Sequence, residues 1–136
     1  MHIRKRAATG LISAVLVTGA MALTPSAYAA QRDGTSPTGA ASCYGSAHSY
    51  SKPSGSYAYP TGTGHLTTTS NCSDINIKTN TNRYVQVCWL STSTCQSDYT
   101  LTTAGQWTTV ATNVLDGTDF FFWFRSDASS TGDWAA

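Results

Sequence analysis

Four cysteines lie in the middle part of this 136-residue chain, at Cys43, Cys72, Cys88 and Cys95. An even number of cysteines in a short chain predicts two disulfide bonds when the protein matures in an oxidising compartment. A four-thiolate zinc site would instead need close C-x2-C pairs, and this sequence has none. A domain this small buries little surface, so we expect the cross-links to contribute much of its stability. We expect no metal and no cofactor.

The N-terminal residues predict export. Arg4–Arg6 form a basic segment, residues 7–23 are apolar or small, and Ala27–Ala29 form an A-x-A cleavage signature. The alternative is a membrane anchor, but the apolar stretch is near the short limit for crossing a bilayer and contains two glycines. We therefore predict a signal peptide over 1–29 and a secreted, extracellular protein that has no membrane association after cleavage.

Cleavage would change the charge of the protein. The whole chain has a formal net charge of +1, and removal of residues 1–29 would leave five basic against seven acidic residues, a net charge of −2. Nucleic-acid-binding proteins present a dense Lys/Arg surface to the phosphate backbone. A sparsely charged, weakly acidic domain is a poor partner for such a polymer, so we expect no nucleic-acid binding.

The sequence after residue 29 predicts an all-β domain. It lacks Glu, has little Leu or Lys, and is rich in Thr, Val, Tyr, Phe and Trp, which favour strands. Turn residues separate short strand-like runs, a pattern typical of small sandwiches and barrels. The runs are 46–50, 56–59, 65–69, 74–78, 84–90, 95–101, 107–111 and 120–125. We expect a disulfide-stabilised antiparallel β-sandwich or barrel over 43–126, after a disordered linker at 30–42 and before a C-terminal tail at 127–136.

The position of the cysteines favours one strand register. A hairpin of 84–90 with 95–101 would set Cys88 opposite Cys95 and Tyr84 opposite Tyr99, which leaves Cys43 to bond Cys72. Pairing 74–78 beside 84–90 would then complete one apolar face. That face would consist of Ile75, Ile77, Tyr84, Cys88, Leu90, Cys95, Tyr99 and Leu101.

A register slipped by one residue is the alternative. It would pair Cys72 with Cys88 and Cys43 with Cys95, and it would turn Val85, Val87 and Trp89 toward the core. A one-residue slip moves every side chain to the other face of the sheet. We favour the first scheme because its cross-strand pairs are consistent with one another.

The strongest apolar run is Phe120–Phe124, which shows no alternation. Such a run predicts a central strand covered on both faces, and an exposed aromatic surface is the less favoured alternative. The turn signal Asp116–Gly117 precedes it and predicts a return of 107–111 antiparallel to this strand.

Three segments carry a family resemblance: CSDINIK at 72–78, RYVQVC at 83–88 and GQWTTVATNVLDGTDF at 105–120. On these segments the chain resembles a loose group of uncharacterised small secreted proteins from actinobacteria. The resemblance spans Cys72–Arg125, about half of the chain after the signal peptide. It implies secretion and a β domain, and it implies no activity.

Few residues suggest catalysis. His48 and His65 are the histidines that remain after cleavage, and no G-x-S-x-G segment accompanies them. The acidic residues are all Asp, which are typical of turns and lack the spacing of a calcium loop.

Aromatic residues are the better candidates for a binding site. Tyr44, Tyr50, Tyr57 and Tyr59 lie in a segment rich in Gly and Ser, which has too few aliphatic residues to bury every ring. Exposed Tyr and Trp rings stack on sugar faces or contact protein partners. With Trp89, these tyrosines are the predicted binding residues, and ordinary packing of tyrosines between strands is the alternative.

Together these features predict a secreted, non-enzymatic binding module whose partner is a carbohydrate, a cell-wall polymer or an extracellular protein. An alternative is an extracellular protease inhibitor with Ser91–Thr94 as its contact loop, held by Cys88 and Cys95. The least favoured alternative is a small hydrolase with His48 or His65 beside an Asp in a pocket.

Overall fold

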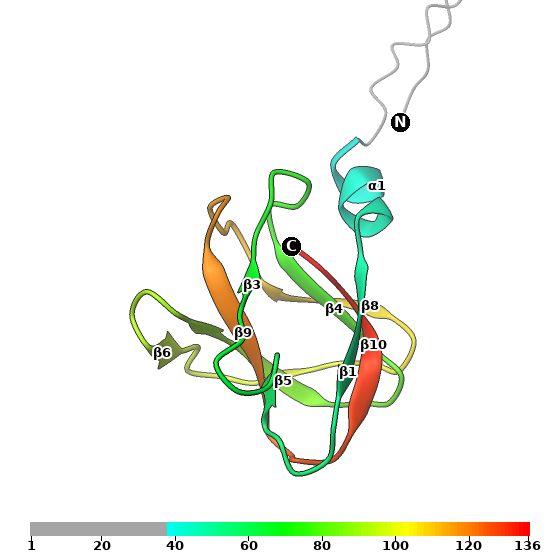
Figure 1. Ribbon diagram of the computed structural model, residues 1–136. Helices are drawn as coiled ribbons and strands as arrows, with labels where there is room; N and C mark the ends of the chain where they lie inside the picture. Colours follow the sequence, from blue (N-terminus) through cyan, green and yellow to red (C-terminus); the bar gives the residue numbers. More distant parts are fainter. Residues whose placement is uncertain (1–37) are drawn as a thin grey trace, which may run out of the picture. The chain divides into compact units, whose positions relative to one another are not determined.

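A computed structural model describes residues 38–136 of the chain. The signal peptide predicted at 1–29 and most of the linker predicted at 30–42 lie outside the described residues. Within this range the chain forms one short helix and ten short strands (Figure 1). They are α1 (Thr38–Gly45), β1 (His48–Lys52), β2 (Ala58–Tyr59), β3 (Leu66–Thr67), β4 (Ile75–Thr79), β5 (Tyr84–Trp89), β6 (Thr94–Cys95), β7 (Thr100–Leu101), β8 (Trp107–Ala111), β9 (Asp119–Phe124) and β10 (Ser130–Ala135).

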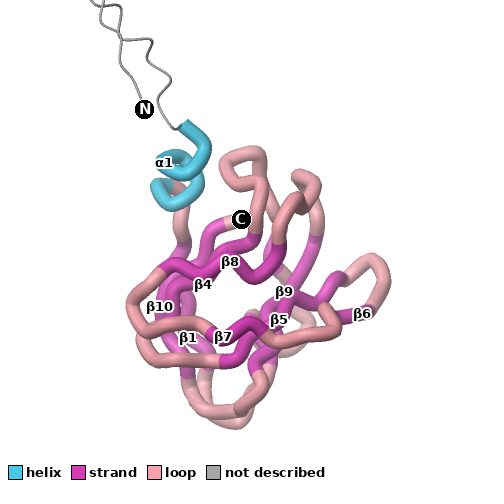
Figure 2. Tube along the Cα trace, turned by 180° about the vertical axis from the view of Figure 1, so that it is seen from behind, coloured by secondary structure: helices cyan, strands magenta, loops and turns pink. Residues whose placement is uncertain are grey.

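The strands form two antiparallel sheets. Sheet A has the strand order β1-β10-β4-β8, and sheet B has the order β2-β9-β5-β6, with β3 also paired to β9 and β7 to β5. The two sheets share one hydrophobic core, and β6 and β7 lie toward opposite ends of β5 (Figure 2). The predicted all-β, disulfide-stabilised antiparallel fold is confirmed, and its two separate sheets make it a sandwich.

Both sheets contribute large apolar side chains to the core. Alternate residues of each strand point inward, so a strand needs only every second residue to be apolar. The buried members are Tyr50, Leu66, Ile75, Ile77, Val85, Val87, Val110, Ala111, Phe120, Phe122, Phe124, Trp134 and Ala136.

Strand β9 divides the aromatic run between two surfaces. Phe120, Phe122 and Phe124 are fully buried in the core, whereas Phe121 and Trp123 point outward and are half-buried. The predicted central position is confirmed, because β9 lies between β2 and β5. The prediction that both of its faces are covered is wrong for the outer face.

Both disulfides have the favoured pairing. Cys43–Cys72 joins α1 to the loop before β4, and these cysteines pack with Ala135 in a second, smaller cluster. Cys88–Cys95 joins directly opposed residues of β5 and β6. Two disulfides in a small domain are typical of an oxidising compartment.

Three predicted details of the strand pairing are wrong. Strand β4 lies between β10 and β8 in sheet A, so it does not pair with β5. Strand β8 pairs with β4 and not with β9, although Asp116–Gly117 does form a turn. Tyr84 faces Leu101 instead of Tyr99, because the register along β5 shifts by two residues between β6 and β7.

The predicted apolar face is therefore only partly in the core. Ile75 and Ile77 are fully buried, but the larger side chains from β5 and the following segment point outward. The exposed members of the predicted face are Tyr84, Leu90, Cys95, Tyr99 and Leu101. Val85 and Val87 fill the core instead, which is what the alternative register predicted. The disulfides nevertheless have the pairing that the favoured register predicted.

The segment predicted as a C-terminal tail is an inner strand of sheet A. Strand β10 pairs with β1 on one side and with β4 on the other, and Trp134 and Ala135 are buried. Its polar composition concealed it, because backbone hydrogen bonds to two neighbours do not depend on side-chain polarity. Residues 38–42, predicted as disordered, belong to α1.

Candidate functional site

The outward side of sheet B carries a group of exposed and half-exposed apolar side chains. We call this group the outer aromatic face, and it consists of Tyr57, Tyr84, Leu90, Leu101, Phe121 and Trp123. Tyr57 is 45% exposed and Tyr84 is 43% exposed. A contiguous exposed apolar patch on a small domain marks an interaction surface more often than chance exposure.

The rings at the centre of this face are held against one another. Tyr57 stacks on Trp123 with ring centroids 5.8 Å apart and planes within 14° of parallel. The rings of Phe121 and Trp123 pack in a T-shaped arrangement, with centroids 6.4 Å apart and planes at 70°. Strand pairing fixes the backbone beneath them, because Trp123 lies opposite both Ala58 of β2 and Gln86 of β5.

A shallow concavity of about 300 Å³ lies beside the stacked rings. Trp123, Phe121 and Leu90 form its apolar side, and the loop at 58–64 forms the other. This loop starts with a cis peptide bond at Tyr59–Pro60, and Gly64 passes so close to it that a Cβ would lie 2.8 Å from Cβ of Pro60. Because the loop and the rings line the same concavity, they form one surface.

A covalent bond supports the same face. Cys88 lies directly opposite Phe121 in the ladder, and its bond to Cys95 holds β6 at the edge of sheet B. Side chains that project from paired strands lose little conformational freedom when a ligand binds.

The predicted binding aromatics are spread over the molecule. Tyr57 belongs to the outer aromatic face, but Tyr44 lies on α1 and stacks on Trp107 of sheet A, with ring centroids 4.6 Å apart. Tyr59 and Trp89 are partly buried and pack against the core. The structure thus brings only one of the five predicted residues to this face.

Tyr50 is a clear correction, because its ring is 4% exposed and belongs to the core. Its hydroxyl group is hydrogen-bonded to Oγ of Ser130 at 2.8 Å. Burial raises the pKa of Tyr50 to about 12, and the bond to Ser130 opposes the rise. Tyr50 is a structural residue and cannot contact a ligand.

The sequence patterns do not indicate the other members of the outer aromatic face, which are Phe121, Trp123, Tyr84, Leu90 and Leu101. A signal for the first two was present, since an aromatic run without alternation must place rings on both sides of its strand. Burial was the favoured interpretation because most large apolar side chains are buried.

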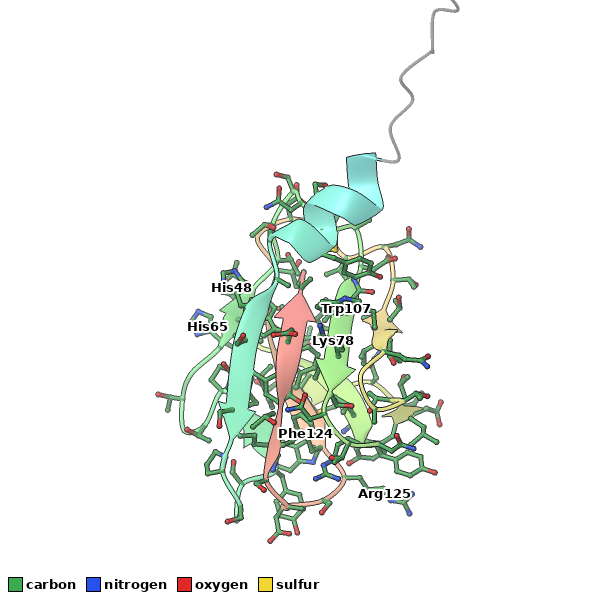
Figure 3. The ribbon with its side chains drawn as sticks, turned by 90° about the vertical axis from the view of Figure 1, so that its right-hand side faces the viewer. His48, His65, Lys78, Trp107, Phe124 and Arg125 are labelled. Atoms are coloured by element: carbon green, nitrogen blue, oxygen red, sulfur yellow. A yellow bond between two sulfur atoms is a disulfide. The ribbon has the colours of Figure 1, made fainter. Side chains whose placement is uncertain are left out.

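Both histidines of residues 38–136, His48 and His65, lie on exposed parts of the surface (Figure 3). His48 stacks on Trp134 with ring centroids 4.9 Å apart. Nε2 of His65 lies 3.8 Å from Oδ1 of Asp119, which accepts a hydrogen bond from Thr67. A catalytic base works best where water is excluded, and neither histidine has such surroundings.

The loop Ser91–Thr94 is a tight turn that joins β5 to β6. Ser93 adopts a positive φ of 52°, and the hydroxyl groups of Thr92 and Thr94 are hydrogen-bonded at 2.7 Å. A left-handed residue breaks the extended conformation in which a peptide pairs along a cleft. This geometry does not favour the loop as a protease-contact segment.

In the part of the chain that the structure describes, no three His, Cys, Asp or Glu side chains are grouped as they would be around a metal ion. No helix within residues 38–136 has the length and apolar character to cross a bilayer. Comparisons with protein-family models, with curated proteins and with solved structures find no match to this chain. The resemblance to small secreted actinobacterial proteins stays a prediction.

Proposed function

We propose that this protein is secreted and acts outside the cell as a non-enzymatic carbohydrate-binding module. Its ligand would be a polysaccharide, such as a cell-wall polymer, bound on the outer aromatic face. The observation that carries the proposal is the stacked pair Tyr57 and Trp123 beside an open concavity. The export-type sequence at 1–29 and the two disulfides support secretion.

The chemistry of the face suits a sugar polymer. One side of a sugar ring presents C–H groups that pack on an aromatic ring, while its edge presents hydroxyl groups that need hydrogen-bond partners. Tyr57 and Trp123 supply the rings, and the loop at 58–64 supplies Thr63 and exposed backbone groups. An open surface of this kind accepts a long chain that continues past both ends of the site.

The test is co-sedimentation of the full chain with insoluble chitin, cellulose, xylan and peptidoglycan. Tyr57→Ala removes the exposed ring of the stacked pair, and Trp123→Ala removes its partner. Loss of one stacked ring is worth about 1–2 kcal/mol, so each variant should bind about 5- to 30-fold more weakly.

Tyr44→Ala is the matched control, because Tyr44 is 39% exposed and also stacks on a tryptophan but lies on α1. It should bind like the unaltered protein. Circular dichroism must show that all three variants keep the β fold. If no polysaccharide retains the chain, or if Tyr44→Ala and Tyr57→Ala weaken binding equally, the proposal is wrong. Binding to a protein alone would likewise contradict it.

A further inference from the structure

Two arginines line a second concavity at one end of the outer aromatic face. It measures about 430 Å³, and its lining includes Arg83, Arg125, Tyr84 and Leu101. The guanidinium group of Arg125 lies over the ring of Tyr84, 5.2 Å from the centroid. The sandwich end that carries Arg125 is opposite the end that carries α1 (Figure 3).

Neither arginine has a carboxylate partner among the residues that the structure describes. The described residues contain four Lys and Arg side chains, of which Lys52 is buried among backbone carbonyls and Lys78 pairs with Asp133 at 2.8 Å. Arg83 and Arg125 form no ion pair within residues 38–136, although this range contains more acidic than basic residues. Their positive charge is left available to an external anion.

Arg83 is partly organised and partly unsatisfied. It donates hydrogen bonds to the carbonyl oxygens of Asn82 at 3.1 Å and Ser129 at 2.8 Å, which fix the direction of its side chain. Its Nε is buried and has no hydrogen-bond partner within the described part of the chain. Among residues 38–136, the contact with the Tyr84 ring is what holds the Arg125 side chain, which leaves its guanidinium N–H groups able to donate to a ligand.

The arginine concavity and the stacked rings lie on the same side of one strand. Phe121 and Trp123 alternate along β9, and Arg125 directly follows its last residue in the same alternation, so all three point away from the core. Arg125 continues the ladder, because its N–H donates to the carbonyl of Tyr84 at 3.0 Å. Four residues of strand span about 13 Å, so one extended ligand can reach from Phe121 to Arg125.

We infer that this concavity is an oxyanion subsite and that the ligand is an acidic polysaccharide. The inference rests on the proposed function, which supplies the sugar-stacking rings. The planar guanidinium fork of Arg donates paired hydrogen bonds to a carboxylate or to a sulfate ester. The rings would hold the neutral faces of the sugars while Arg125 and Arg83 bind their acidic groups.

The experiment measures affinity of the full chain for soluble probes by isothermal titration calorimetry. Polygalacturonate presents carboxylates, its methyl ester is the same polymer without charge, and dextran sulfate presents sulfate esters. Polygalacturonate should bind at least roughly tenfold more tightly than its methyl ester, the ratio expected for one charge-assisted hydrogen bond. The difference should shrink as salt is added. The dextran sulfate arm shows whether carboxylate or sulfate ester is the preferred oxyanion.

Arg125→Gln should remove the preference for polygalacturonate over its methyl ester. Arg125→Lys should keep only part of that preference, because an ammonium group cannot donate the paired hydrogen bonds of a guanidinium group. Lys78→Gln is the charge-matched control, since it removes one positive charge from sheet A, and it should leave the preference unchanged. Equal binding of acid and ester, or equal effects of Arg125→Gln and Lys78→Gln, would overturn the inference.

The two proposals fail in different ways. If Tyr57→Ala still weakens binding to both polymers while Arg125→Gln has no effect, the aromatic face binds sugars and the oxyanion subsite is wrong. If Tyr57→Ala has no effect on any polymer, the proposed function itself is wrong. Absence of binding to all three probes contradicts the acidic-polysaccharide ligand.

Discussion

Replacing Gly132 by Ala should destabilise the sandwich more than any other single addition of a methyl group to a glycine of the described chain. Gly132 lies in β10 between Tyr50 of β1 and Thr79 of β4, with a φ of +153°. A Cβ at this position would lie 1.9 Å from the carbonyl oxygen of Lys78 and 2.9 Å from its carbonyl carbon. Both atoms are backbone, so no side-chain rotation relieves the clash.

The magnitude follows from two costs. A non-glycine residue at this φ costs on the order of 1–3 kcal/mol of backbone strain. Forcing β10 and β4 apart costs about 1–3 kcal/mol of lost packing and ladder hydrogen bonds. The free energy of unfolding should therefore fall by about 2–6 kcal/mol, against a total of about 5–15 kcal/mol for a domain of this size. The melting temperature should fall by at least about 8 °C.

Equilibrium unfolding in guanidinium chloride and thermal melting followed by circular dichroism measure these changes. Gly117→Ala is the matched control: its φ is +76°, but a Cβ there would meet nothing within 4 Å. That variant should lose only about 1–2 kcal/mol, the cost of a left-handed residue. If Gly132→Ala is no less stable than Gly117→Ala, the close approach of β10 to β4 does not exist in solution.

Three further predictions concern stability. In the folded protein the pKa of Tyr50 is raised to about 12, so its stabilising contribution is fully present below pH 10. As the pH rises toward 12, the free energy of unfolding should fall by about 3 kcal/mol. Tyr50→Phe should remove that alkaline loss in unfolding titrations, and an unchanged pH profile would contradict the buried hydroxyl. A hydrogen bond from Lys78 and, to a smaller extent, one from Ser49 lower the pKa of Asp133 in the folded protein. The Asp133 carboxylate therefore stabilises the fold above pH 4, and this stabilisation is lost as the pH falls through its lowered pKa. Asp133→Asn should reduce the acid-dependent loss of unfolding free energy by less than about 1 kcal/mol, because the ion pair with Lys78 is partly exposed. A larger change would show that the Asp133 carboxylate stabilises the fold through contacts besides this ion pair. Replacing Cys43 and Cys72 together by Ala should cost about 3–4 kcal/mol in denaturant unfolding, as expected for a cross-link between residues 29 apart, and an unchanged midpoint would show that this bond contributes nothing.

The binding face illustrates how far sequence patterns reach. The Gly- and Ser-rich segment correctly indicated that some tyrosines stay exposed, and Tyr57 is one of them. The same pattern could not separate Tyr57 from Tyr50, because only the fold shows that Tyr50 lies in β1 with its ring in the core, whereas Tyr57 lies just before β2 and stacks on Trp123. Arg83 and Arg125 lie far apart in the sequence, so only strand pairing between β5 and β9 shows that they share a concavity.

Sequence alone determined the all-β class, because β-branched and aromatic residues suit strands. It favoured the correct disulfide pairing without excluding the alternative, because Cys88 and Cys95 are close enough to oppose each other across a turn. Tertiary structure alone decided which strands pair. Strands β4 and β5 follow one another in the sequence, yet they lie in different sheets. The polar segment 130–135 forms β10, an inner strand of sheet A. Backbone hydrogen bonding is nearly the same for every sequence, so strand order follows from burying the aromatic core between two sheets, a requirement of the whole chain.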